Sequence, residues 1–163
     1  MEKWICNPLD LEYRYQYRTS LMGGCSLARE AADPTLLLFK DTYYLFASMS
    51  GGFWYSDDLA DWRFKEIPGL PIYDYAPDVR SIGGRVLFSA SRRGEPCTFY
   101  ASTDPLKEPF QPLASPFDFW DPDMFEDDDG RVYFYWGCTN KEPIWGIEID
   151  PKTMLPIGEK QAM

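Results

Sequence analysis

Residues 120–137 read WDPDMFEDDDGRVYFYWG, and this stretch decides the fold. An extended segment opened by Asp121 and Pro122 runs into a tight Asp-Asp-Gly turn, and a strand of alternating aromatic residues follows. An Asp-Gly pair between two apolar runs is one of the stronger short-range signals for a β-hairpin. Two earlier places in the chain carry weaker copies of the same pattern.

The copies are marked by Pro34, Pro77 and Pro122, which are spaced by 43 and 45 residues. Each proline is followed by a short apolar strand, a turn and a strongly β-prone run, at residues 43–48, 86–91 and 132–137. A third strand follows in each copy, at residues 53–56, 98–102 and 144–149. The sequence therefore contains an internal repeat, which is the first feature to establish in a chain of this kind.

Three aspartates give the same period. Asp58, Asp104 and Asp150 end the third strands and are spaced by 46 and 46 residues. Short fourth strands are expected near residues 63–65 and 110–112. Four strands in each unit of roughly 45 residues are typical of a β-propeller blade. A β-sandwich is the structural alternative, and the internal period favours the propeller.

The predicted fold is all-β: a β-propeller with about three four-stranded blades near residues 33–74, 75–119 and 120–163, after an N-terminal arm at residues 1–32. Within the arm, residues 13–18 suit an edge strand or an extended segment. Residues 26–32 have helix propensity but form too short a run to hold a helix alone. Propellers close with about four to eight blades, and three blades leave two open sheet edges. We therefore expect a truncated chain, one half of a split protein, or a unit that completes itself by self-association or with a missing C-terminal half.

Composition excludes several classes of function. The chain has 163 residues, a net charge of −10 and no histidine, so it cannot build a Ser-His-Asp triad or a His-ligated zinc site. The acidic balance argues against a nucleic-acid partner. No run approaches the ~18 apolar residues of a membrane span. The first residues have no apolar signal-peptide core, so the expected location is cytoplasmic, with the four scattered cysteines as free thiols.

Four motifs in order resemble glycoside hydrolase family 43. They are residues 29–36 (REAADPTL), 50–58 (SGGFWYSDD), 75–79 (YAPDV) and 121–130 (DPDMFEDDDG). The resemblance runs from about residue 7 to the end of the chain. It implies a five-bladed β-propeller that hydrolyses β-xylosides or α-L-arabinofuranosides with inversion, and an oligosaccharide as the substrate.

The family's site has three carboxylates, and the resemblance assigns two of them here. Asp33 matches the general base that activates water, and Asp121 matches the residue that orients the acid and sets its pKa. The repeat agrees, because both stand one residue before the proline that opens a blade, where the second blade has Ala76. The general acid is a glutamate of the fourth blade, which this chain lacks. We therefore expect the acid beyond the chain end and a chain that is inactive or incomplete alone.

Other residues are expected around these carboxylates. Tyr75 and Trp120 stand beside the blade-opening prolines and suit stacking on a sugar ring, and Ser50 and Arg92 lie in loops expected at the same face. Asp78 is left out of the catalytic set. No metal site and no cofactor are expected, because the acidic run 127–129 lacks the spacing of a calcium loop and suits a solvated hairpin turn.

Three other functions remain open. A carbohydrate-binding or partner-assembling fragment without turnover is the first. A related propeller phosphorylase is the second. A protein–protein scaffold of the WD type is the third, although no Gly-His or Trp-Asp repeat supports it.

Overall fold

The computed structural model describes residues 9–12, 16–19, 25–28, 31–67, 75–91 and 95–163. These residues contain fourteen β-strands, and none of them is helical. The all-β class predicted from the sequence is confirmed. The first two strands, β1 (Gln16–Thr19) and β2 (Cys25–Ala28), pair as a small antiparallel sheet. The start of the 26–32 run is therefore a strand, because pairing with β1 overrides its weak helix propensity.

The other twelve strands form three antiparallel four-stranded sheets, each built from consecutive strands. Blade 1 consists of β3 (Thr35–Phe39), β4 (Thr42–Phe46), β5 (Gly52–Ser56) and β6 (Arg63–Glu66). Blade 2 consists of β7 (Tyr75–Ile82), β8 (Arg85–Ser91), β9 (Tyr100–Ser102) and β10 (Gln111–Pro112). Blade 3 consists of β11 (Asp123–Glu126), β12 (Val132–Trp136), β13 (Trp145–Ile149) and β14 (Pro156–Ala162). The predicted three four-stranded blades are thus confirmed.

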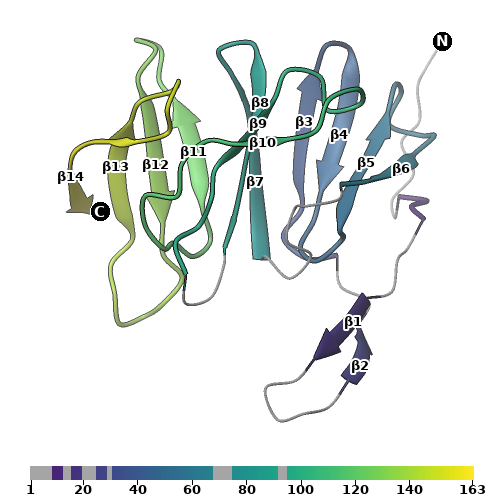
Figure 1. The fold of residues 1–163 in the computed structure, drawn as a ribbon, viewed down its shortest axis with the longest axis horizontal. Coiled ribbons are helices and arrows are strands. Elements are labelled where there is room, and N and C mark those ends of the chain that lie inside the picture. Colours follow the sequence, from purple (N-terminus) through teal and green to yellow (C-terminus); the bar gives the residue numbers. More distant parts are fainter. Residues whose placement is uncertain (1–8, 13–15, 20–24, 29–30, 68–74, 92–94) are drawn as a thin grey trace.

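The blades stand side by side in chain order (Figure 1). Their first strands are neighbours, since β7 contacts both β3 and β11. This arrangement brings the start of each blade to one end of the sheets. The starts of the first strands lie at the lower edge of Figure 1, where the β1–β2 hairpin also projects.

The Asp-Asp-Gly turn of the opening stretch joins β11 to β12. The Asp127 N–H donates to the Arg131 carbonyl at 2.9 Å, and the Gly130 N–H donates to the Asp127 carbonyl at 2.9 Å. Gly130 has a φ of 81°, a left-handed conformation that glycine adopts without steric cost. The exposed Asp129 carboxylate pairs with Arg131 at 2.7 Å. The acidic run is a hairpin turn at the protein surface.

Alternation along β12 explains how the third blade packs. Val132, Phe134 and Trp136 are buried, while Tyr133 and Tyr135 are half-buried on the other face. The period of two places alternate side chains on opposite faces of the sheet. The buried set belongs to a core cluster shared with Leu87, Phe99 and other residues of blade 2. A second cluster joins blade 2 to blade 1 through residues such as Val79, Phe88, Phe46 and Phe53.

The 46-residue spacing of aspartates has a structural cause. Asp58 Oδ1 accepts the Ala60 and Asp61 N–H groups at 2.9 Å each. Asp104 Oδ1 accepts the Leu106 N–H at 3.2 Å, and Asp150 Oδ1 accepts the Lys152 and Thr153 N–H groups at 2.7 and 3.0 Å. Each carboxylate therefore supports the turn after its blade's third strand, a recurrent use of aspartate in turns.

The outer face of blade 1 is covered in part by the N-terminal segment. Leu9 and Leu11 pack against a cluster that includes Trp54. The Trp54 indole N–H donates to the Glu12 carbonyl at 2.9 Å. Because Trp54 is 2% exposed, this hydrogen bond satisfies a buried donor and fixes the segment against the sheet.

Candidate active site

Asp33 and Asp121 occupy equivalent positions, each directly before the proline that opens a blade. Asp33, Ala76 and Asp121 have φ angles of 51°, 48° and 50°. Positive φ is uncommon for residues other than glycine and costs of order 1–3 kcal/mol. Such strain gathers at functional sites. The repeated conformation presents the first residue of each blade at the same end of the sheets, which we call the mouth.

Two buried serines hold this geometry between blades. The Ser48 hydroxyl accepts the Ala76 N–H at 2.9 Å and donates to Asp33 Oδ2 at 3.1 Å. The Ser91 hydroxyl accepts the Asp121 N–H at 2.9 Å. Ser48 lies two residues after β4 and Ser91 is the last residue of β8, and both are 1% exposed or less. Each therefore satisfies a donor of the next blade, and Ser48 also fixes the carboxylate of Asp33.

The two mouth carboxylates interact electrostatically. The pKa of Asp121 is raised above its ordinary value, first by loss of hydration and second by the negative charge of Asp33. A hydrogen bond from the Cys138 thiol acts in the opposite direction and lowers the pKa of Asp121. The structure thus brings together the two residues predicted as base and modulator. Like-charge repulsion of this kind is one way in which proteins raise carboxyl pKa values.

A cavity of about 270 Å³ opens between the first strands of the three blades. Its lining consists of the three residues before the prolines, the prolines themselves, the residues Thr35, Asp78 and Asp123 that follow them, and Arg80. The first strands converge here, as the repeat predicts. The cavity holds the carboxylates of Asp33 and Asp121 together with two further aspartates.

Asp78, which the sequence analysis leaves out of the catalytic set, lines the same cavity. Its side chain is buried, its Oδ2 accepts the Met124 N–H at 2.7 Å, and its Oδ1 lies 3.2 Å from Arg80. Arg80 also donates to the Met124 carbonyl at 2.9 Å and to Asp123 Oδ1 at 2.5 Å. Burial raises the pKa of Asp78 to about 6, although Arg80 and the Met124 N–H lower it. Asp78 therefore ties blade 2 to β11, the strand that follows Asp121.

A sequence signal for Asp78 existed. It occupies the blade 2 position that corresponds to Thr35 in blade 1 and Asp123 in blade 3, and all three are polar. Thr35 makes the equivalent contact between blades, donating to the Pro77 carbonyl at 2.6 Å. The repeat alone would have marked the position as one where a polar side chain reaches the next blade.

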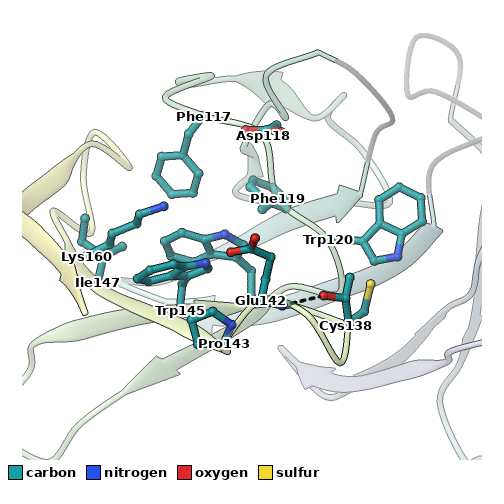
Figure 2. A pocket seen from close by; sticks show the side chains of 13 residues that line it. Phe117, Asp118, Phe119, Trp120, Cys138, Glu142, Pro143, Trp145, Ile147 and Lys160 are labelled. Atoms are coloured by element: carbon teal, nitrogen blue, oxygen red, sulfur yellow. Dashed lines mark hydrogen bonds between the residues drawn. The ribbon is translucent and has the colours of Figure 1, made fainter. Parts of the chain in front are cut away.

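Trp120 lines a second and larger cavity of about 850 Å³ beside Asp121. Figure 2 shows Trp120 and Cys138 on one side of it and Phe117, Trp145 and Lys160 on the other. The predicted place of Trp120 near the mouth therefore coincides with an aromatic cavity. Cys138 links the two cavities, because it lines the larger one and donates to the Asp121 carboxylate.

The other predicted binding residues are placed differently. Ser50 is buried, and its hydroxyl lies 2.9 Å from the Ala47 carbonyl and 2.8 Å from the Gly52 carbonyl. The backbone of its own turn therefore engages the hydroxyl. The backbone of Tyr75 pairs with Ser91 at the start of β7. The Tyr75 side chain and Arg92 lie outside the described residues.

Among the described residues, no cluster of three or more His, Cys, Asp or Glu side chains has a geometry that could hold a metal ion. In the same residues, the carboxylates that line the smaller cavity all belong to aspartates. No described helix is long and apolar enough to cross a membrane. A glutamate, Glu142, lines the larger cavity.

A family model supplies the identification. The model described as glycosyl hydrolases family 43 matches residues 26–163. The chain belongs to glycosyl hydrolases family 43. A comparison with curated proteins gives no match. The resemblance that the four motifs predicted is confirmed, and the family 43 match includes both Asp33 and Asp121.

Solved structures agree on the fold. An α-L-arabinofuranosidase from Clostridium thermocellum is similar with a TM-score of 0.67 and 19% identity, over 80% of this chain and 55% of that one. An endo-arabinanase of family 43 from Bacillus licheniformis gives a TM-score of 0.66 and 20% identity, over 82% and 56%. A xylan beta-1,4-xylosidase from Bacillus halodurans gives 0.63 and 19%, over 82% and 32%.

The family 43 chain is thus a partial β-propeller of the five-bladed type. It spans about half the length of the first two solved relatives. Identities near 20% establish the likeness of fold alone. The function is therefore inferred from the geometry of the two mouth carboxylates, Asp33 and Asp121, and not from the similarity of fold.

Proposed function

We propose that this chain forms the part of a family 43 glycoside hydrolase that supplies the general base and the modulating carboxylate. The reaction is hydrolysis of an O-glycosidic bond with inversion, and the substrate is of the β-xyloside or α-L-arabinofuranoside type. The observation that carries the proposal is the pair of equivalent strained aspartates, Asp33 and Asp121, whose charges interact at one mouth. The solved relatives include an α-L-arabinofuranosidase, an endo-arabinanase and a xylan beta-1,4-xylosidase, and this supports the substrate class.

Each carboxylate has a distinct role. Asp33 takes a proton from the water molecule that attacks the anomeric carbon, and the Ser48 hydroxyl holds the carboxylate in place by its hydrogen bond to Oδ2. Asp121 orients the general acid, and its negative charge raises the pKa of that acid by repulsion. Inversion requires acid and base about 6.5–9.5 Å apart, with room for water between them.

The general acid comes from a glutamate outside these 163 residues. Its role is to protonate the leaving-group oxygen, which contributes about 10²–10⁴-fold to the rate. A leaving group that departs as a stable anion does not need that proton. The chain alone is therefore expected to hydrolyse an activated aryl glycoside and to fail on an alkyl glycoside.

This expectation gives the test. The wild-type chain is incubated with dinitrophenyl β-xyloside and dinitrophenyl α-L-arabinofuranoside, and dinitrophenolate release is followed by absorbance. Asp33→Asn should lower the rate about 10²–10⁴-fold. Asp57→Asn is the matched control, because Asp57 lies in the same blade and its exposed carboxylate pairs with Arg63 at the surface. Equal rates for wild type and Asp33→Asn would refute the proposal.

A second candidate is carbohydrate binding without turnover. It is favoured by the absence of glutamate from the lining of the smaller cavity in the described residues. The same experiment separates the two candidates. Oligosaccharide binding with no dinitrophenolate release above the buffer rate would support the binding function.

A further inference from the structure

The larger cavity has a well-defined place in the fold. It lies between residues 117–120, which lead into β11, and the β12–β13 face of blade 3. Trp136 and Ile147 belong both to its lining and to the core cluster shared with blade 2. The cavity is therefore on the blade 2 side of blade 3, and both of its walls belong to this chain.

Five of the thirteen residues that line the cavity are aromatic. The Phe117 and Trp136 rings stack with centroids 4.8 Å apart and planes at 29°. Trp145 is partly buried beside them and carries the Lys160 ammonium 4.0 Å from its ring centroid. Flat apolar walls of this kind pack against flat ligands, and a sugar ring presents an apolar face of C–H groups.

The polar groups around these walls suit hydroxyls. The lining includes the carboxylates of Asp118 and Glu142 and the ammonium of Lys160. Glu142 is positioned by its loop, where the Thr139 hydroxyl accepts the Glu142 N–H at 3.0 Å. Two carboxylates and one ammonium disfavour an anionic ligand but hydrogen-bond well to a neutral ligand with many hydroxyls. A volume of about 850 Å³ lies within the range of small-molecule sites.

The cavity adjoins the mouth. Trp120 lines it and directly precedes Asp121 in the chain, and Cys138 lines it and donates to the Asp121 carboxylate. Trp120 and Cys138 lie together at one side of the cavity (Figure 2), and this is the side next to Asp121.

We propose that the aromatic cavity is a second carbohydrate subsite, which holds neutral sugar units of the same chain whose scissile bond lies at Asp33 and Asp121. The inference rests on the proposed glycosidase function and deepens it: the substrate is an oligosaccharide that extends along blade 3, rather than a single-sugar glycoside. Trp145 provides the stacking surface and Glu142 accepts sugar hydroxyls.

Calorimetric titration of the 163-residue chain tests the proposal. The ligands are xylo-oligosaccharides and arabino-oligosaccharides of two to six units. Affinity should rise with chain length for one of the two series. Trp145→Ala should weaken binding of its longest member about tenfold, the effect of losing one aromatic contact. Glu142→Ala, in an exposed loop, should weaken it in the same direction without altering the fold.

Tyr133→Ala is the matched control, because Tyr133 is a half-buried aromatic residue of the same blade on the opposite face. Its affinity should equal that of the wild type. Circular dichroism checks that each variant is folded. If Trp145→Ala and Glu142→Ala bind the longest oligosaccharide as tightly as the wild type does, the subsite is refuted.

Two further variants separate this failure from a failure of the proposed function. If Asp121→Asn weakens binding while the cavity variants do not, the mouth binds sugar and only the subsite is wrong. If the cavity variants weaken binding while Asp121→Asn does not, the cavity binds sugar apart from the mouth, and a single sugar chain across both is refuted. If 4-nitrophenol binds as tightly as the oligosaccharides and loses as much affinity in Trp145→Ala, the cavity recognises flat apolar rings rather than sugars. Absence of all oligosaccharide binding refutes the subsite, while the release of dinitrophenolate from the single-sugar glycosides tests the proposed function separately.

Discussion

Replacing Asp78 by asparagine should change how the stability of the protein depends on pH. Asp78 is 3% exposed, and burial raises its pKa to about 6 from an ordinary value of 3.8. The folded protein therefore holds the proton more tightly than the unfolded chain between these two values. In that window the wild type loses stability as the pH rises, because folding disfavours the charged carboxylate. Asparagine stays neutral and keeps an oxygen that can accept the Met124 N–H.

The size of the effect follows from the two pKa values. A difference of about 2 pH units at about 1.4 kcal/mol per unit corresponds to about 3 kcal/mol. The free energy of unfolding of Asp78→Asn, relative to the wild type, should therefore rise by about 3 kcal/mol between pH 4 and pH 7. The relative value should be flat above pH 7, where the wild-type carboxylate is fully charged.

Urea unfolding followed by tryptophan fluorescence, at pH values from 4 to 8, measures this difference. The comparison isolates Asp78, since all other carboxyl groups are common to both proteins. A relative stability that stays constant across the range would show that burial does not dominate at Asp78. A relative stability that falls with rising pH would show that the ion pair with Arg80 outweighs burial, and would refute the reasoning.

Three further predictions concern the mouth and the core. Asp33→Asn should lower the pKa of Asp121, because the charge of Asp33 helps to raise it; carboxyl carbon NMR titration measures this, and an unchanged titration of Asp121 would contradict the pairing. Ser48→Ala should reduce the free energy of unfolding by about 1–3 kcal/mol, because the Ala76 N–H loses its acceptor. Urea unfolding measures this loss, and a loss below a few tenths of a kcal/mol would mean that water replaces the hydroxyl. Phe134→Ala should lower the free energy of unfolding by about 3–5 kcal/mol, because its fully buried ring packs between blades 2 and 3. Leu38→Ala is the control, because Leu38 is 54% exposed and its loss should change the free energy of unfolding little. Similar losses for both variants would contradict the assignment of the core.

Most of the fold follows from the sequence because the repeat is written in residues with specific backbone roles. The prolines before each first strand, and the aspartates that support each turn after the third strand, recur in register with the blades. These prolines and aspartates keep the same spacing in all three blades, although the apolar residues between them differ. The strand at Cys25–Ala28 could not be predicted in the same way, because its partner strand, rather than its local propensity, determines its conformation.

The sequence predicts the two mouth aspartates of the candidate site, but it predicts fewer of the residues around them. Asp33 and Asp121 stand out because both are aspartates at a position of the repeat where the second blade has Ala76. The roles of Ser48 and Asp78 depend on contacts between blades, which a pattern within one blade does not contain. Ser50 was expected at the mouth from its loop position, but its hydroxyl turns inward to backbone carbonyls. Loop membership predicts which end of the sheet a residue occupies, not where its side chain points.

The central claim is that Asp33 activates water at a mouth shared with Asp121, and the anomeric configuration of the first sugar released tests it most directly. Proton NMR of the 163-residue chain with dinitrophenyl β-xyloside, or with the α-arabinofuranoside, reports this configuration before mutarotation. The account predicts the inverted anomer, because water attacks from the side opposite the leaving group when Asp33 serves as base. Release of the retained anomer would contradict the account, because retention requires a covalent sugar–carboxylate intermediate.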